Sequence, residues 1–274
     1  MNILLTNRSM KFRAGSEMWV KTMYEELKKR GYDVDIFTIA ENKMIPESYD
    51  EKKHYSLALI NHNVCLEKVK NWNIDCKVFT SHGVIPALER PCKGANKYVA
   101  VSEEVREAMK KRGFESAIIR NPINTCLFKP TINNQELKNI LYLDNRQRVV
   151  DIVREACKGY NLEIVAGGSQ DVRKKIGEAD LVITLGRGCY ESLASGRNVI
   201  VFGHHGADGM MTEESYIESR KCNCSGRRYK EKWDAKRLRE ELEKYNPAVN
   251  LRPLILQSHK VERIVEQYVR VANN

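Results

Sequence analysis

Residues 180–203 read DLVITLGRGCYESLASGRNVIVFG. The first apolar run, 180–185, has the length and the β-branched residues of a buried strand, and the run 198–202 predicts a second strand. Between these runs a Gly-Arg-Gly turn precedes a short helix, which we expect over 190–195, and Gly196 ends it. The order strand, glycine turn, helix and strand is typical of a parallel sheet covered by helices.

The same alternation extends outward from this stretch in both directions. On the N-terminal side we expect strands at 3–6, 34–37, 57–61, 77–80, 97–101 and 116–120, with helices at 16–30 and 102–112, the second capped by Ser102. Around the quoted stretch we expect strands at 139–143 and 162–165 and helices at 148–158, 170–176, 233–245 and 258–271. The chain is therefore α/β, with two successive Rossmann-like, doubly wound units.

Length and the linker signal place the domain boundaries. A chain of 274 residues is long enough for two domains of roughly 100–200 residues each. The aperiodic stretch 124–135, which holds Pro130, is the expected linker. We predict an N-terminal domain over 1–130, a C-terminal domain over 131–257, and a final helix over 258–274 that packs back toward the N-terminal domain. Ligands of such folds bind at the carboxyl ends of the strands, so we expect the two domains to face a cleft.

Composition indicates the cellular compartment. Hydrophobic residues make up 42% of the chain, yet no apolar run approaches the roughly 18–20 residues that cross a bilayer. The N-terminus has no basic flank of a signal peptide, so we expect a cytoplasmic protein whose eight cysteines stay reduced. Cys222 and Cys224 form an isolated Cys-x-Cys pair, which is a weak metal signal, and we expect no metal site.

A formal net charge of +10 favours anionic partners. Nucleotide diphosphates, acidic lipid surfaces and nucleic acid all fit this charge, which alone does not choose among them. The basic residues are dispersed along the chain, as in Lys28-Lys29-Arg30 and Arg227-Arg228, and most are expected on solvated helix faces.

The quoted stretch also carries the strongest candidate binding residues. Gly186 and Gly188 let the backbone approach a phosphate group, and Arg187 can form bidentate hydrogen bonds with phosphate oxygens. Glu191 can accept hydrogen bonds from a ribose diol, although a glutamate early in a helix also suits the helix dipole. We predict that this segment binds a nucleotide.

Two further candidates lie near the N-terminus. Gly15 and Ser16 open the first helix after the first strand, where free N–H groups can bind an anion. His82 follows the strand at 77–80 and precedes a glycine, so it is expected at the ligand-binding edge of the sheet. His54, His62 and His259 have no such context, and we expect them on the surface.

Taken together, these segments resemble the GT-B superfamily of glycosyltransferases, particularly its large family-4-type retaining group. Three stretches, in the family's order, carry the resemblance: Gly15-Ser16-Glu17 with the helix exit Arg30-Gly31-Tyr32-Asp33-Val34, the runs 98–105 and 119–124, and Glu191-Ser-Leu-Ala-Ser-Gly196-Arg-Asn-Val-Ile200. They span nearly the whole chain.

The resemblance implies roles for single residues. Glu191 would bind the donor ribose, and His82 would lie near the transferred sugar and the leaving phosphate. Independently of the resemblance, we expect Arg187 to act in catalysis by holding the diphosphate and stabilising its developing charge. Gly15 would lie where donor phosphate and acceptor meet, and Arg146 or Arg148 would neutralise the diphosphate. The expected reaction is transfer of a sugar from a nucleotide-diphosphate sugar with retention of configuration. No metal and no cofactor other than this donor substrate is implied.

Two positions depart from the family pattern. Ile183 stands where the first glutamate of the family's pair is expected, and the loop after 139–143 reads Asp144-Asn145-Arg146-Gln147-Arg148 in place of Gly-Arg…Lys-Gly. Two alternatives stay open: a non-catalytic nucleic-acid or sugar-binding protein, and a sugar-nucleotide epimerase. The acceptor is open too, with a glycan, a lipid-linked saccharide at a membrane face and modified nucleic acid as candidates.

Overall fold

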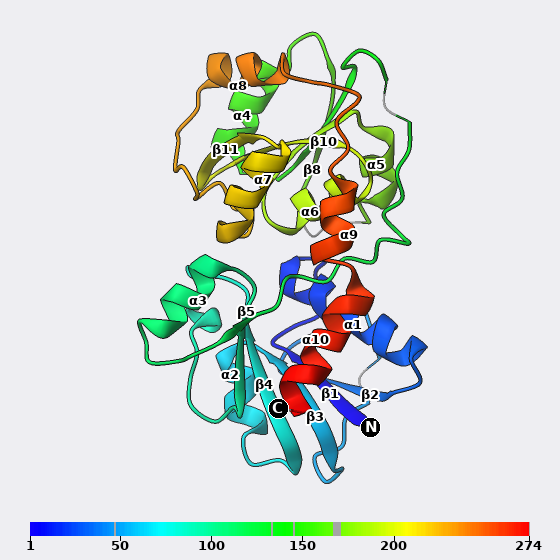
Figure 1. Ribbon diagram of the computed structural model, residues 1–274, viewed down its shortest axis with the longest axis vertical. Helices are drawn as coiled ribbons and strands as arrows, with labels where there is room; N and C mark the ends of the chain where they lie inside the picture. Colours follow the sequence, from blue (N-terminus) through cyan, green and yellow to red (C-terminus); the bar gives the residue numbers. More distant parts are fainter. Residues whose placement is uncertain (47, 133, 145, 167–170, 274) are drawn as a thin grey trace. The chain divides into compact units, whose positions relative to one another are not determined.

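A computed structural model describes residues 1–46, 48–132, 134–144, 146–166 and 171–273 (Figure 1). Contacts divide the chain into an N-terminal unit, Met1–Pro122 with Val261–Asn274, and a C-terminal unit, Ile123–Lys260. The N-terminal unit ends its first segment at Pro122, before the predicted end at residue 130. The reason is that Ile123 and Phe128 are buried in the core of the C-terminal unit, where Arg252 Nη1 donates to the Phe128 carbonyl oxygen over 2.5 Å.

The N-terminal unit is built on a six-stranded parallel sheet with the order β2-β1-β3-β4-β5-β6. Because the chain runs outward in both directions from β1, the strand order reverses between β1 and β3. The strands are β1 (Asn2–Asn7), β2 (Asp33–Thr38), β3 (Tyr55–Asn61), β4 (Ile74–Ser81), β5 (Lys97–Ala100) and β6 (Ala117–Ile118). The helices are α1 (Gly15–Lys29), α2 (Asn63–Val69), α3 (Glu103–Lys110) and α10 (Val261–Asn273), with a short 3₁₀ turn, η1 (Ala87–Glu89).

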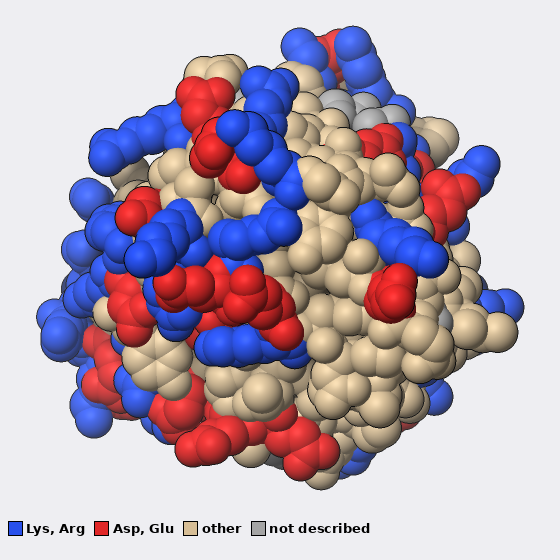
Figure 2. All heavy atoms as spheres, turned by 90° about the horizontal axis from the view of Figure 1, so that it is seen from above, with Lys and Arg blue, Asp and Glu red and all other residues tan. Residues whose placement is uncertain are grey.

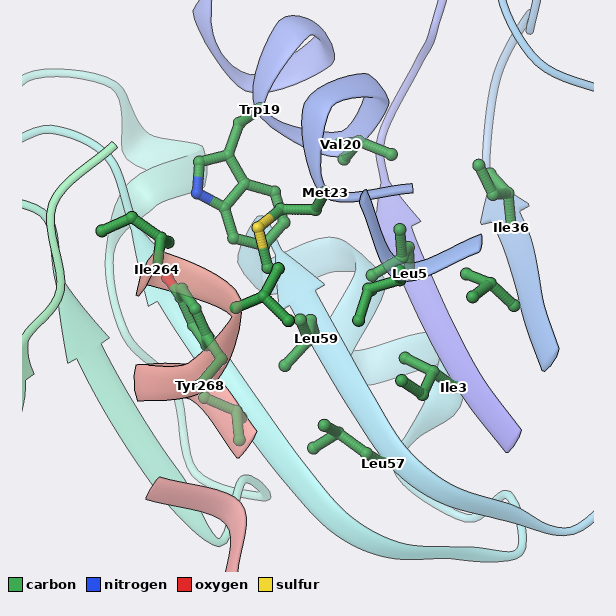
Figure 3. Packing of buried hydrophobic residues seen from close by; sticks show 14 of the residues in the cluster. Ile3, Leu5, Trp19, Val20, Met23, Ile36, Leu57, Leu59, Ile264 and Tyr268 are labelled. Atoms are coloured by element: carbon green, nitrogen blue, oxygen red, sulfur yellow. The ribbon is translucent and has the colours of Figure 1, made fainter. Parts of the chain in front are cut away.

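Two helices from opposite ends of the chain cover one face of this sheet. Figure 3 shows Trp19 and Met23 of α1 and Tyr268 of α10 over the same strands. The hydroxyl groups of Tyr268 and Thr80 lie 3.1 Å apart, and Arg30 Nη2 donates to the Glu262 carbonyl oxygen over 2.7 Å. The C-terminal helix is therefore an integral layer of the N-terminal unit. Leu66 and Met109 contribute to the apolar cluster on the other face.

The C-terminal unit has a five-stranded sheet with the order β11-β10-β9-β7-β8. Read from β8, this order is β8-β7-β9-β10-β11, which matches the first five strands of the N-terminal sheet. Four strands are parallel and β11 is antiparallel to β10. The strands are β7 (Asn139–Leu143), β8 (Asn161–Val165), β9 (Leu181–Thr184), β10 (Asn198–Gly203) and β11 (Gly206–Met210). The helices are α4 (Gln147–Ala156), α5 (Arg173–Glu178), α6 (Arg187–Ala194), α7 (Glu213–Ser219), α8 (Ala235–Leu242) and α9 (Arg252–Ser258), and η2 (Arg220–Cys222) is a 3₁₀ turn.

Several local expectations need correction. Helix α6 begins at Arg187 rather than at 190, so Arg187 and Gly188 belong to its first turn and Glu191 to its second. The N-cap of α1 is Ala14, so the helix begins at Gly15, one residue before the expected start. The expected cap of α3 is confirmed, since Ser102 Oγ accepts from the Val105 N–H. Helices α2, α7 and α9 and strand β11 were not expected. Part of the helix predicted over 170–176 lies outside the described residues.

Candidate functional site

The carboxyl edge of the C-terminal unit gathers three segments. Strand order reverses between β7 and β9, and the loops that leave such strands border the ligand crevice in doubly wound folds. Gly188 lies against both strands: a Cβ there would come within 2.4 Å of Thr184 Oγ1 and 3.4 Å of Leu143 Cδ1. His204, directly after β10, places Nδ1 3.4 Å from the Asp144 carboxylate after β7. The ends of β7, β9 and β10 therefore meet at one edge.

Gly186 shapes the entry to α6. Its φ of +60° lies in the left-handed region, which glycine adopts without a steric penalty. Its N–H donates to the Cys224 carbonyl oxygen over 2.7 Å, which ties the loop to the segment after η2. The first turn of α6 is thereby fixed against the strand ends.

Arg187 and Glu191 form an ion pair within α6. Arg187 Nε donates to Glu191 Oε1 over 2.6 Å, and the two side chains are 10% and 7% exposed. Burial raises the pKa of Glu191 above its ordinary value, even though the charge of Arg187 and its hydrogen bond act in the opposite direction. The arginine thus holds a buried carboxylate in place.

Arg146 and Arg148 lie on a pocket beside this edge. The pocket has a volume of about 350 Å³ and lies between the start of α4 and the end of β10. Both arginines are exposed, and Arg146 is the N-cap of α4. Lys232 adds a third cation and Glu231 a carboxylate, which accepts from Trp233 Nε1 over 2.7 Å. The Trp233 ring, stacked on Phe202 at a ring distance of 5.9 Å, forms an apolar wall.

Positive charge dominates the surroundings of this pocket. Burial lowers the pKa of His205, and the positive charges of Arg227, Arg146 and Lys232 lower it further. The carboxylate of Asp144 raises this pKa but does not outweigh them. A site with this balance favours an anion.

In the N-terminal unit, His82 follows β4 directly. Its Nε2 lies 2.9 Å from Asn61 Oδ1, and its ring meets Trp19 edge-on at a centroid distance of 5.6 Å. Trp19 lies one helical turn after Gly15. Gly15 is exposed and a Cβ added there would meet no atom within 4 Å, while Ser16 Oγ donates to Glu17 Oε2 over 3.0 Å. Within this unit, the structure brings His82 and the start of α1 to the same edge of the sheet.

A buried carboxylate that the sequence analysis missed anchors His82. Glu89 is 6% exposed, and its Oε2 accepts the backbone N–H of His82 over 2.6 Å while Oε1 lies 3.5 Å from His62 Nε2. Burial alone would raise the pKa of Glu89, but His62 and His82 together hold it below its ordinary value. Glu89 is thus an ionised group inside the protein.

The placement of two histidines on the surface was wrong. His62 is 8% exposed, its φ is +69°, and its Nδ1 accepts the Arg8 N–H over 3.2 Å. A non-glycine residue in this conformation is strained and needs such bonds to hold it. His259 is fully buried and stacks on Tyr190 at 4.0 Å. His54 is half exposed, as expected.

A metal site is a cluster of ligating side chains, and a membrane span is a long apolar helix. Within the residue ranges given above, no three His, Cys, Asp or Glu side chains gather as a metal site requires. In the same part of the chain, no helix has both the length and the apolar character of a membrane span.

Comparison with solved structures identifies the fold. HepE of Anabaena, solved with UDP-glucose, matches all of this chain and 99% of its own, with a TM-score of 0.64 and 13% identity. AviGT4, a glycosyltransferase involved in avilamycin A biosynthesis, matches with a TM-score of 0.58 and 12% identity over 100% and 97% of the two chains. An α-glucosyltransferase solved with UDP and a 13-mer DNA matches over the full length of both chains, with a TM-score of 0.57 and 10% identity.

No protein-family model and no curated protein sequence matches the chain. The likeness therefore lies in the fold, which covers the entire chain in each of the three comparisons. The chain has the GT-B fold, two successive Rossmann-like units.

Proposed function

We propose that the protein is a glycosyltransferase that transfers a sugar from a nucleotide-diphosphate sugar to a hydroxyl-bearing acceptor. The observation that carries this proposal is the cationic pocket of Arg146, Arg148 and Lys232 beside the point where strand order reverses in the C-terminal unit. Solved structures with the same fold hold UDP-glucose or UDP. A diphosphate is the anion that this edge suits.

The diphosphate would be bound by groups from two segments. Arg146 and Arg148 offer guanidinium donors from the start of α4, and the backbone of Gly186 and Gly188 allows a close approach at the start of α6. As the bond to the sugar breaks, negative charge grows on the leaving phosphate. Fixed cations at that position stabilise the transition state, and we propose that they do so without a metal ion.

Glu191 would bind the ribose. Its carboxylate is already desolvated and oriented by Arg187, so a ribose diol can donate to it without further ordering of the side chain. In this arrangement Arg187 acts by positioning Glu191, which refines its expected role as a direct phosphate ligand. Retention of configuration, which the sequence resemblance implies, is part of the proposal.

The acceptor's carrier is a separate question. The net charge of +10 supports an anionic carrier such as nucleic acid or an anionic membrane surface, and the DNA-bound α-glucosyltransferase makes DNA a reasonable first substrate to assay. On the face in Figure 2, however, Lys and Arg side chains alternate with Asp and Glu instead of forming a continuous basic stripe. We propose that the protein acts in the cytoplasm, where nucleotide sugars are available.

Binding of nucleotides by the intact protein tests the proposal. UDP, UDP-glucose and a panel of other nucleotide sugars are titrated by calorimetry, with and without EDTA. An Arg146→Ala, Arg148→Ala variant should bind about tenfold or more weakly, since charge-assisted hydrogen bonds are lost. Arg154→Ala is the matched control, because Arg154 is exposed on the same helix but lies near its other end.

The wild type should also hydrolyse the bound donor slowly when no acceptor is present. Release of free nucleotide diphosphate that rises with added acceptor distinguishes a transferase from an epimerase. If no nucleotide or nucleotide sugar binds the wild type, the proposal is wrong.

A further inference from the structure

The core of the N-terminal unit ends in a polar row at the carboxyl edge of its sheet. Side chains alternate between the two faces of a strand, and in-register residues of parallel strands share a face. On the face of the sheet that α1 and α10 cover, Leu5, Leu59 and Val78 lie side by side on neighbouring strands and are apolar. Two residues further toward the carboxyl ends of these strands, the same face carries the polar residues Asn7, Asn61 and Thr80.

Asn7 and Asn61 flank the point where strand order reverses. They end β1 and β3, the two strands between which the order changes direction. Doubly wound folds with the order 2-1-3-4-5 bind their ligands at this position. Trp19 of α1 lies above the same face, and its ring contacts His82 (Figure 3 shows Trp19 over the core).

Three polar atoms at this edge, two from the strands and one from α1, lack a hydrogen-bond partner. They are Asn7 Oδ1, Asn61 Nδ2 and Trp19 Nε1, and all three side chains are fully buried. The other amide atoms are used: Asn7 Nδ2 donates to the Ser9 carbonyl oxygen over 2.6 Å, and Asn61 Oδ1 lies 2.9 Å from His82 Nε2. Buried polar groups are rarely left unsatisfied, since each costs about 1–3 kcal/mol.

The chemistry of these atoms defines the ligand. Two are N–H donors, one is a carbonyl acceptor, and none carries a charge. A hydroxyl group both donates and accepts a hydrogen bond, whereas a phosphate or carboxylate oxygen only accepts. The nearby Glu89 carboxylate already accepts the backbone N–H of His82. Neighbouring hydroxyl groups of a neutral sugar or polyol fit this set.

We propose that Asn7, Asn61 and Trp19 form a hydroxyl-binding site for a neutral sugar or polyol in the N-terminal unit. The inference rests on the proposed function, and the ligand is either the transferred sugar of the donor or the acceptor. The half-buried His82 ring and the exposed start of α1 at Gly15 border the site, so a ligand enters beside them. Because the three atoms themselves are covered, entry requires the start of α1 to shift slightly.

Nuclear magnetic resonance reports directly on this site. The chain has three tryptophans, Trp19, Trp72 and Trp233, so its ¹⁵N–¹H spectrum contains three indole signals. The Trp19→Phe variant removes one and thereby assigns it. We expect the Trp19 indole signal to shift in a saturable manner when a neutral hydroxylated ligand binds, because its N–H gains an acceptor.

Three titrations separate the sources of the ligand. A shift with UDP-glucose but not with UDP assigns the site to the donor sugar. A shift with glucose, methyl α-glucoside or glycerol in the presence of UDP assigns it to the acceptor. If the Trp19 signal stays in place with all of these ligands, the inference is overturned, whereas the Trp233 signal, from the wall of the cationic pocket, tests nucleotide binding independently.

Variants at the two ends of one strand add a functional measurement. Asn7→Ala should raise the half-saturating concentration of the hydroxylated ligand about tenfold, the loss expected for one or two hydrogen bonds. Asn2→Ala is the matched control, since Asn2 starts the same strand and donates to the His54 carbonyl oxygen far from this edge. Equal effects of the two substitutions would mean that Asn7 is only structural. Folding of the N-terminal unit in each variant is checked by the indole signal of Trp72, which belongs to the same unit and should stay in place.

Discussion

A single methyl group at Gly188 tests how tightly α6 must lie against the strand ends. In the Gly188→Ala variant the new Cβ would stand 2.4 Å from Thr184 Oγ1 and 3.4 Å from Leu143 Cδ1. Overpacking of this kind costs about 1–3 kcal/mol, while replacing a helical glycine with alanine returns up to about 1 kcal/mol. The net expectation is a destabilisation of about 1–2 kcal/mol.

Urea denaturation measures this change, and Gly177→Ala is its control. Gly177 is also a helical glycine of the C-terminal unit, but a Cβ there meets only Thr131 Cγ2, at 3.9 Å. That variant should be as stable as the wild type or slightly more stable, because only the gain in helix propensity remains. The Gly188→Ala variant should also bind nucleotide more weakly, since the first turn of α6 moves away from β7 and β9.

Removing the obstructing hydroxyl should restore stability. In a Thr184→Ala, Gly188→Ala double variant the closest contact is gone, so its free energy of unfolding should exceed the sum expected from the two single changes. Additive effects, or a Gly188→Ala variant that is more stable than the wild type, would refute the argument that this contact fixes the start of α6.

Three further predictions concern buried charges. Arg187→Met leaves the Glu191 carboxyl buried without its cation and should lower the free energy of unfolding by about 3 kcal/mol; an unchanged urea midpoint would contradict this. Because burial raises the pKa of Glu191, the folded unit should lose stability as pH rises from the ordinary value of 4.5 through the raised one, and Glu191→Gln should remove that slope from urea midpoints measured between pH 4 and pH 8. The pKa of Glu89 is lowered, so its contribution to stability is present above pH 4.5 and disappears as pH falls through the folded value. Glu89→Gln should therefore be less stable than the wild type at neutral pH and equal to it in strong acid. If the free energies of unfolding of the two proteins differ by the same amount at every pH, Glu89 is not ionised in the folded protein.

The sequence predicted the strands well where they are apolar and continuous. The run at 139–143 coincides with β7, and the runs that end at Asn61 and Phe202 lie within β3 and β10. Short helices were not predicted because their apolar periodicity is weak. Helix α9, for example, has Pro253 at its start and only Ile255 fully buried. The antiparallel β11 reads GADGM, which is too poor in apolar residues to indicate a strand.

The candidate sites were predictable only where their residues are close in sequence. The Gly186-Arg187-Gly188 turn and Glu191 lie within six positions of the chain, so the sequence could single them out together, and their binding role stays a prediction. The Arg187–Glu191 pair was missed because the helix was expected to begin after Arg187, which hides the four-residue spacing. Glu89 and His62 were missed for a different reason, since they come from a 3₁₀ turn and the end of a strand that only the fold brings together.

The same strand order thus supports two edges of different chemistry. In the C-terminal unit the loops beyond the reversal of strand order carry Arg146 and Arg148, whose charges suit an anion. In the N-terminal unit the strands at the reversal end in Asn7 and Asn61, whose uncharged amides we propose to bind hydroxyl groups, while the loop after β1 carries Arg8, Lys11 and Arg13. A nucleotide-diphosphate sugar has an anionic part and a polyhydroxylated part, so an anion site and a hydroxyl site would both serve the proposed donor. Contacts to nucleic-acid phosphates alone would leave Asn7 Oδ1 unpaired, because phosphate oxygens cannot donate a hydrogen bond to it.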